Sequence, residues 1–187
     1  MRKLSEKEQK LTDWCNELIY DSTDYSDIKV INIAQNAIEF AYDNLKEKEC
    51  IYEGYLYQYE VNIGNIALAI ESHLQKNARN KKSSNIKQFV SDIIYNEKYG
   101  RGRSDYIFLL SVLKMDEELR SIATERTDFW ETPRMQFQLM HALFKRKISG
   151  FAKEAEMLIV NNPKEIELKK YAKKYIEKYG FDKADGE

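Results

Sequence analysis

The chain has 187 residues, of which 43% are hydrophobic and 33% are charged, and its formal net charge is −1. This length suits a single folded domain, and the hydrophobic content excludes a chain that is disordered throughout. Only two prolines and seven glycines are present, too few for the many tight turns of an all-β protein. The composition therefore predicts an all-α protein.

Two amphipathic helices are predicted before residue 50. In the first, Leu4, Leu11 and Leu18 recur along one face, and Ser5 with Glu8 matches a capping box at its start. The second should span residues 27–46, where apolar side chains are frequent enough to bury most of the helix surface. Both helices are expected to pack into the core.

A third helical segment is predicted over residues 50–76. Gly54 and Gly64 are the positions at which it is expected to break or bend, since glycine costs about 1 kcal/mol relative to alanine inside a helix. The polar stretch 77–84 follows and is typical of an exposed loop. The next helix should end at Gly100, in a left-handed conformation.

Short antiparallel helix pairs are predicted after residue 102. Thr132 and Asn162 each precede a proline, which places an N-cap residue before a first helical position where the missing N–H costs nothing. Asp116 is expected to cap a further helix over residues 117–126. The chain should thus form eight or nine helices and no strand, and its second half resembles the HEAT-like stacking of antiparallel helical hairpins.

Charge is divided unevenly along the chain. Residues 1–75 carry seven Lys and Arg against fourteen Asp and Glu, whereas residues 76–187 carry 23 against 17. We expect one helical domain over residues 1–187, in which the charge allows an acidic sub-lobe 1–76 and a basic sub-lobe 84–180 with a loop 77–83 between them. Such an asymmetry bears on the choice of partner rather than on the fold.

No recognised catalytic motif is present in the sequence. His73 and His141 are the only histidines, and each is expected at a helix border with its ring partly packed. The stretch 100–103 is too short for a phosphate-binding loop and lacks the Lys-Ser/Thr that would follow it. Cys15 and Cys50 are predicted to be buried thiols, since neither belongs to a CxxC pair. We therefore assign no catalytic residue, metal or cofactor.

The first eight residues lack an apolar stretch, and no run of apolar residues approaches the length of a membrane span. These two observations predict a protein without a secretion signal and without membrane contact. A cytoplasmic location is the simplest expectation.

The acidic half contains two stretches in which carboxylates accompany tyrosines. They supply the candidate partner-binding residues Asp21, Asp24, Tyr25, Asp27, Glu49, Tyr52, Glu53, Tyr55, Tyr59 and Glu60. Tyrosine offers a large contact area at a low cost in entropy and is frequent at interface hot spots. On a helix, Tyr52, Tyr55 and Tyr59 would share one face. The competing interpretation is that these rings line the core with their hydroxyls at its border.

The basic half supplies a second set of candidates, for binding nucleic acid. These are Lys81, Lys82, Arg101, Arg103, Lys145, Arg146 and Lys147. Phosphate binding needs such groups clustered on one surface. Acidic residues are interspersed among them and no known nucleic-acid recognition motif accompanies them, so an ordinary solvated helical surface is the competing interpretation.

The size, the usage of Lys, Asn, Ile and Tyr, and the acidic–aromatic stretches 21–27 and 50–60 resemble helical immunity proteins of bacterial polymorphic and contact-dependent toxin systems. This resemblance implies a stoichiometric inhibitor that binds a basic, nuclease-type toxin domain and covers its active or substrate-binding face. Complementary charge would speed capture of such a partner. The alternative is a helical-repeat protein that binds nucleic acid with its basic half.

Overall fold

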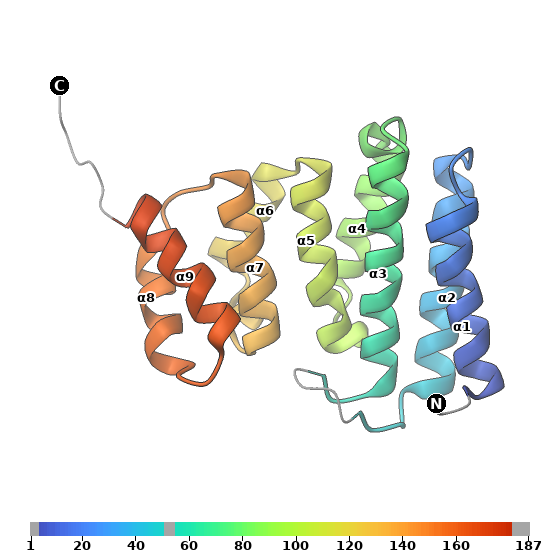
Figure 1. Cartoon of the computed structure of the whole chain (residues 1–187), viewed down its shortest axis with the longest axis horizontal. Helices are drawn as coiled ribbons and strands as arrows, with labels where there is room; N and C mark the ends of the chain where they lie inside the picture. Colours follow the sequence, from blue (N-terminus) through green and yellow to red (C-terminus); the bar gives the residue numbers. More distant parts are fainter. Residues whose placement is uncertain (1–3, 51–54, 181–187) are drawn as a thin grey trace.

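The computed structural model describes residues 4–50 and 55–180, and Tyr52 and Glu53 lie outside the described residues. Within this part the chain forms nine α-helices and no strand, which confirms the all-α class (Figure 1). The helices are α1 (Glu6–Asn16), α2 (Asp27–Leu45), α3 (Gln58–Lys76), α4 (Ser84–Tyr95), α5 (Ser104–Leu113), α6 (Asp116–Glu125), α7 (Pro133–Arg146), α8 (Ala152–Asn161) and α9 (Ile166–Tyr179).

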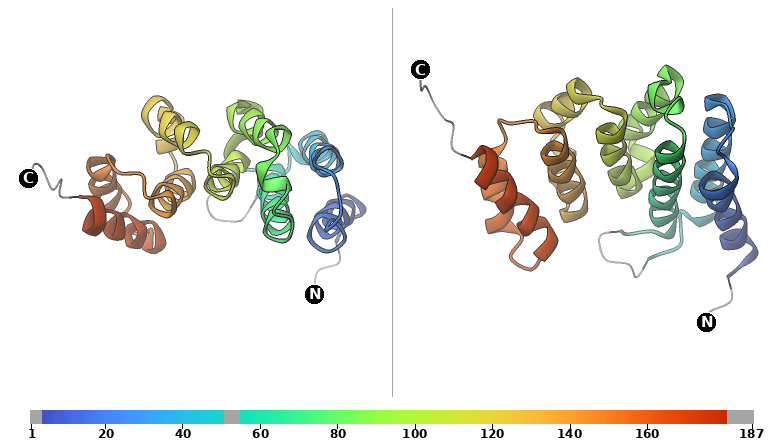
Figure 2. Two further views of the ribbon diagram at one scale, coloured as in Figure 1. Left: turned by 90° about the horizontal axis from the view of Figure 1, so that it is seen from above. Right: turned by 45° about the horizontal axis from the view of Figure 1, so that its top comes forward.

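The helices form two layers along one row, with α1 and α9 at opposite ends (Figures 1 and 2). The odd-numbered helices lie side by side in one layer, where α3 contacts α5, α5 contacts α7 and α7 contacts α9. The even-numbered helices form the other layer. Layering of this kind is common to many helical arrays, so the HEAT-like resemblance of the second half stays a prediction.

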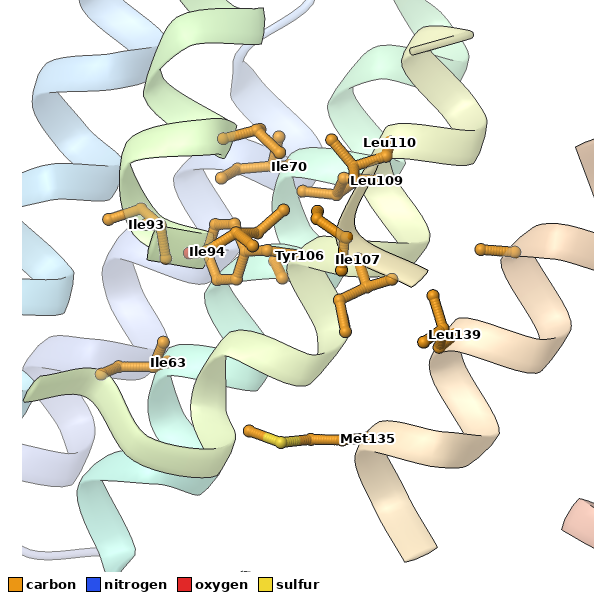
Figure 3. Close-up of a cluster of buried hydrophobic side chains, with 14 of the residues drawn as sticks. Ile63, Ile70, Ile93, Ile94, Tyr106, Ile107, Leu109, Leu110, Met135 and Leu139 are labelled. Atoms are coloured by element: carbon orange, nitrogen blue, oxygen red, sulfur yellow. The ribbon is translucent and has the colours of Figure 1, made fainter. Parts of the chain in front are cut away.

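Helix α5 lies at the centre of the row and is buried along almost its whole length. Of its ten residues, only Phe108 and Val112 are not buried. Its apolar side chains meet those of α3, α4 and α7 in one cluster, in which Ile107 is the labelled α5 side chain on the side of Leu139 of α7 (Figure 3). Burial of this apolar surface stabilises the packing of α3, α4 and α7 on α5.

Two of the predicted helix starts are confirmed. Ser5 and Glu8 form both hydrogen bonds of a capping box at α1. The Thr132 side chain accepts a bond from the Met135 N–H at the start of α7, with Pro133 as the first helical residue. Local sequence decides these ends because the side chain and the backbone group that it caps are only three residues apart.

Three other predicted starts are wrong. Helix α3 begins at Gln58 rather than near residue 50. The chain just before this helix forms a backbone hydrogen bond with residue 50 instead, in which the Cys50 N–H donates to the Leu56 carbonyl at 3.0 Å. Helix α9 begins at Ile166, and the Asn162 amide donates to Gln136 on α7 instead of capping a helix. The N-cap of α6 is Met115, one residue before Asp116.

Gly100 has the predicted positive φ of 52°, but it does not end α4, which stops at Tyr95. It is a non-helical residue that divides the segment Glu97–Arg103 into two short 3₁₀ turns before α5.

No helix in the described part of the chain has both the length and the apolar content to cross a membrane.

The fully buried tyrosines Tyr106 and Tyr175 differ in how their hydroxyls are satisfied. The Tyr175 hydroxyl donates to the Ile148 carbonyl at 2.6 Å and accepts from the Phe151 N–H at 3.3 Å, which joins α9 to the start of α8. The Tyr106 hydroxyl has no hydrogen-bond partner among the described residues. A buried hydroxyl without a partner costs free energy, whereas a bonded one contributes to stability.

We expect Tyr175→Phe to lower the free energy of unfolding by about 1–3 kcal/mol, because it leaves the Ile148 and Phe151 backbone groups unpaired. Tyr106→Phe removes an unsatisfied group of the same kind and should leave stability unchanged or raise it. Urea unfolding of the two variants beside the wild type measures the difference. An equal loss in both variants would contradict the assignment of Tyr106.

Candidate binding surfaces

The two acidic stretches lie at opposite ends of α2. Residues 21–27 precede this helix and residues 47–50 follow it, and a helix of 19 residues is about 28 Å long. Asp21, Asp24 and Glu49 are exposed, and none of them forms an ion pair with the described residues. The candidate acidic residues therefore form two separate clusters rather than one continuous patch.

The first cluster lies beside basic residues of the α3–α4 connection. Asp24, Tyr25 and Asp27 line a hollow of about 560 Å³ together with Lys76 and Arg79. Asp27 accepts hydrogen bonds from the hydroxyl of Ser83 at 2.6 Å and from the amide of Asn85 at 3.0 Å. These bonds hold the pKa of its carboxyl below the usual range. Asp27 therefore joins two inter-helix connections, whereas the Asp24 carboxylate has no hydrogen bond or ion pair with the described residues.

A buried histidine holds the same two connections together. The Ser22 hydroxyl donates to the Leu18 carbonyl and lies 2.7 Å from His73 Nδ1, so the imidazole donates there. The Asn80 amide donates to His73 Nε2 at 2.9 Å and to the Tyr25 carbonyl at 3.1 Å. His73 is therefore neutral with its proton on Nδ1. The loop predicted at 77–83 is anchored to the α1–α2 turn through Asn80.

In the second acidic stretch, the carboxylate of Glu60 is buried. Glu60 is 2% exposed, and its carboxylate accepts bonds from the N–H groups of Leu56, Tyr57 and Arg101 at 2.6, 3.0 and 2.8 Å. A side chain at position 100 would lie 2.2 Å from this carboxylate, which explains the glycine there. Glu60 thus closes the connection before α3 onto the connection before α5, and it is not available to a partner.

The tyrosines of this stretch do not share a helix face, contrary to the expectation. Tyr55 precedes α3, whereas Tyr59 lies within it. Tyr59 is 8% exposed and packs edge-on against Tyr42, and burial raises its pKa to about 12. Tyr55 is half-buried and bonded to Asp105. For these two residues the interpretation of rings at the core border describes the structure.

Asp105 on α5 accepts hydrogen bonds from three residues of two other segments, the connection before α3 and helix α7. Its carboxylate accepts from the Tyr55 hydroxyl at 2.8 Å, from Arg134 at 2.9 Å and from the Gln138 amide at 2.7 Å. The Arg134 guanidinium also lies 4.1 Å from the centre of the Tyr55 ring. Gly64 of α3 leaves room for this group, since a Cβ there would lie 2.5 Å from the Asp105 carboxylate. The sequence offered no local signal for this network.

The basic candidates are scattered, and two of them are occupied within the fold. Arg103 is 5% exposed and binds the carbonyls of Ile94 and Gly100 and the carboxylate of Asp128. Arg146 is paired with Asp116. Lys82, Lys145 and Lys147 are exposed, and Lys81 and Arg101 are half-buried. They lie at three different connections of the array, so the predicted set does not form one nucleic-acid surface.

An aromatic–lysine face, which the sequence reasoning missed, lies on α5, α7 and α9. We define it by the side chains Phe108, Phe137, His141, Phe144, Tyr171, Lys145, Lys174 and Lys178. The His141 ring centre lies 4.5 Å from that of Tyr171 and 4.7 Å from that of Phe108. All five ring-bearing residues are partly exposed, and the three lysines are exposed. Their spacing along α7 and α9 was a usable signal, but only the structure brings Phe108 beside them.

His141 has no hydrogen bond to the described residues. Burial and the neighbouring charge of Lys145 lower its pKa, so its imidazole is neutral at neutral pH. In the described part of the chain, no three His, Cys, Asp or Glu side chains are grouped so as to hold a metal ion.

Comparisons with protein-family models, with curated proteins and with solved structures give no match, so function must be argued from these residues alone.

We expect Gly64→Ala to destabilise the fold by about 1–3 kcal/mol, because the added methyl group would displace Asp105 and Tyr55 from their hydrogen bond. Asn65→Ala, at an exposed position of the same helix, is the control and should change stability by less than about 0.5 kcal/mol. Urea unfolding measures both. A Gly64→Ala variant as stable as the control would contradict the expectation that the added methyl group displaces Asp105 and Tyr55.

Both histidines should make the stability depend on pH. Burial, together with the charges of Lys76 and Lys145, lowers the pKa of His73 and of His141, so the unfolded chain binds protons more readily than the folded one. Their contribution is present above about pH 6.5, the unfolded value, and is lost as the pH falls below it, by up to about 1.4 kcal/mol per pH unit for each histidine. Urea unfolding between pH 7.5 and 5.5 checks this, and His73→Gln should remove part of the slope. A stability that is constant over this window contradicts the expectation.

Proposed function

We propose that this chain is a stoichiometric protein-binding inhibitor that captures a basic partner with the exposed carboxylates around α2. The observation that carries the proposal is that Asp21 and Asp24 at one end of α2, and Asp43, Glu47 and Glu49 at the other, are exposed and form no ion pair with the described residues. Unpaired surface carboxylates steer the approach of a positively charged protein.

The surroundings of the first cluster support an interface. Tyr20 and Ile28, on either side of Asp21 and Asp24, are 70% and 59% exposed. Large apolar side chains beside charged ones are typical of a binding patch. The apolar groups are buried against the partner, and the charges orient it. The two clusters, about 28 Å apart, can both be covered by a partner of ordinary interface size, about 800 Å² on each side.

The buried ionisable groups support binding rather than catalysis. Asp105, Glu60 and Arg103 each have their hydrogen bonds filled by other parts of the same chain. Such groups hold helices and connections together. The resemblance to helical immunity proteins gives this proposal its finer form, in which the partner is a basic, nuclease-type toxin domain whose active or substrate-binding face is covered.

The test first looks for a toxin-like domain encoded beside this chain's own gene and then uses that domain as the partner. Cells that express that domain should survive only with the chain present, and the two proteins should elute together in a one-to-one complex. Reversing one carboxylate at each end, Asp24→Lys with Glu49→Lys, should slow association tenfold or more at low salt, because long-range attraction is lost.

The matched control reverses two exposed carboxylates of the second half, Glu131→Lys with Glu156→Lys, and should leave the association rate within about twofold of the wild type. An association rate that the Asp24/Glu49 variant leaves unchanged would remove the carboxylates from the interface. The absence of any complex would overturn the proposed function itself.

A further inference from the structure

We propose that the aromatic–lysine face of α5, α7 and α9 binds single-stranded nucleic acid. This inference goes beyond the proposed protein-binding function and does not depend on it, because the two surfaces involve different helices. The face lies in the odd-numbered layer toward the α9 end of the row, whereas α2 belongs to the other layer near the α1 end (Figure 2).

The charge of α7 and α9 favours a polyanion. Helix α7 contains two arginines and one lysine and no carboxylate, and α9 contains five lysines against two glutamates. Within the fold, the two arginines of α7 form ion pairs with Asp105 and Asp116. On α9, Glu167 pairs with Lys170. Lys145, Lys174 and Lys178 are left exposed and without an ion pair among the described residues. The unpaired charge of these two neighbouring helices is therefore positive.

The rings of the face are held in fixed positions by one another. Phe137 and Tyr171 pack edge to face at 5.5 Å, and Phe144 meets Tyr171 edge to face at 6.4 Å. His141 lies between Phe108 and Tyr171. Because these contacts already restrict the rings, a base that stacks on one of them loses little further side-chain entropy.

Each lysine of the face lies over a ring. The Lys145 ammonium is 4.1 Å from the centre of Phe108, Lys178 is 5.1 Å from Phe144, and Lys174 is 5.5 Å from Tyr171. A nucleotide carries a phosphate and a flat base at a similarly short separation. A phosphate that draws an ammonium outward would uncover the ring beneath it for the base, so one nucleotide would use both groups.

This pairing of charge and ring distinguishes among polyanions. A duplex offers phosphates but keeps its bases stacked inside, so it would contact the lysines and its bases would not stack on the rings. An acidic protein segment would likewise pair with the lysines alone. Single-stranded RNA or DNA engages both kinds of group, in the manner of other strand-binding surfaces that combine aromatic stacking with a basic track.

The test is fluorescence anisotropy with the full chain and a labelled 12-nucleotide single strand of oligo-U or oligo-dT, at about 50 mM salt, where phosphate contacts are strong. The wild type should bind the single strand and prefer it to a duplex of equal length and to polyglutamate. Replacing Lys145, Lys174 and Lys178 together with Gln should reduce the slope of log K against log salt by about 2, since each lost phosphate contact removes about 0.7.

The matched control replaces Lys7, Lys46 and Lys153 with Gln, three exposed lysines elsewhere, and should leave the slope unchanged. Tyr171→Leu should weaken single-strand binding about five- to 150-fold, the loss expected for one stacked base, without changing the slope. A thermal melt confirms that each variant is folded, and Lys145→Gln alone offers a milder second variant at an exposed site.

Three results would overturn the proposal. The first is no anisotropy change with any single strand at low salt. The second is equal binding of duplex and single strand, unaffected by Tyr171→Leu, which would leave only nonspecific attraction to charge. The third is a preference for polyglutamate, which would assign the face to an acidic protein partner.

Discussion

The buried carboxylate of Asp105 is the contact on which the arrangement of the row depends. It lies on α5, the central helix, and it accepts bonds from Tyr55 before α3 and from Arg134 and Gln138 on α7. A charge at 3% exposure is tolerated only when its hydrogen bonds are filled, and removing one partner of such a group typically costs about 3–5 kcal/mol. Asp105 therefore fixes the positions of α3 and α7 relative to α5.

Three further polar contacts link connections in the same way. Glu60 closes the connection before α3 onto the one before α5, and Arg103 joins the α4–α5 connection to Asp128 before α7. His73 and Asn80 join the α1–α2 and α3–α4 connections. Apolar burial along the helices supplies most of the stability, but it does not choose among similar packings. These directional bonds select one arrangement of the connections.

The difference between local and long-range contacts explains which features of the structure could be predicted from the sequence. The stripes of α2 and α4 and the caps at Ser5 and Thr132 depend on residues three or four positions apart, so periodicity predicted them. Glu60 is buried partly because it accepts a hydrogen bond from the N–H of Arg101, 41 residues away. Tyr55 likewise donates to Asp105, which is 50 residues away in the sequence. A carboxylate near tyrosines has the same local pattern whether it faces a partner or a distant backbone, so the sequence leaves both interpretations of the stretch 50–60 open.

The same contacts shape the surfaces that remain. Because Asp105 and Asp116 neutralise the arginines at either end of α7, the exposed positive charge of that helix is carried by Lys145 beside the rings. Because Glu60 and Asp27 are used within the fold, the exposed carboxylates among the candidate partner-binding residues are divided between the two ends of α2. The net charge of −1 thus conceals an acidic region and a basic aromatic region on different helices. The interior bonds hold both in fixed geometry, so a partner of either sign would meet a surface that needs little reorganisation, which lowers the entropic cost of binding.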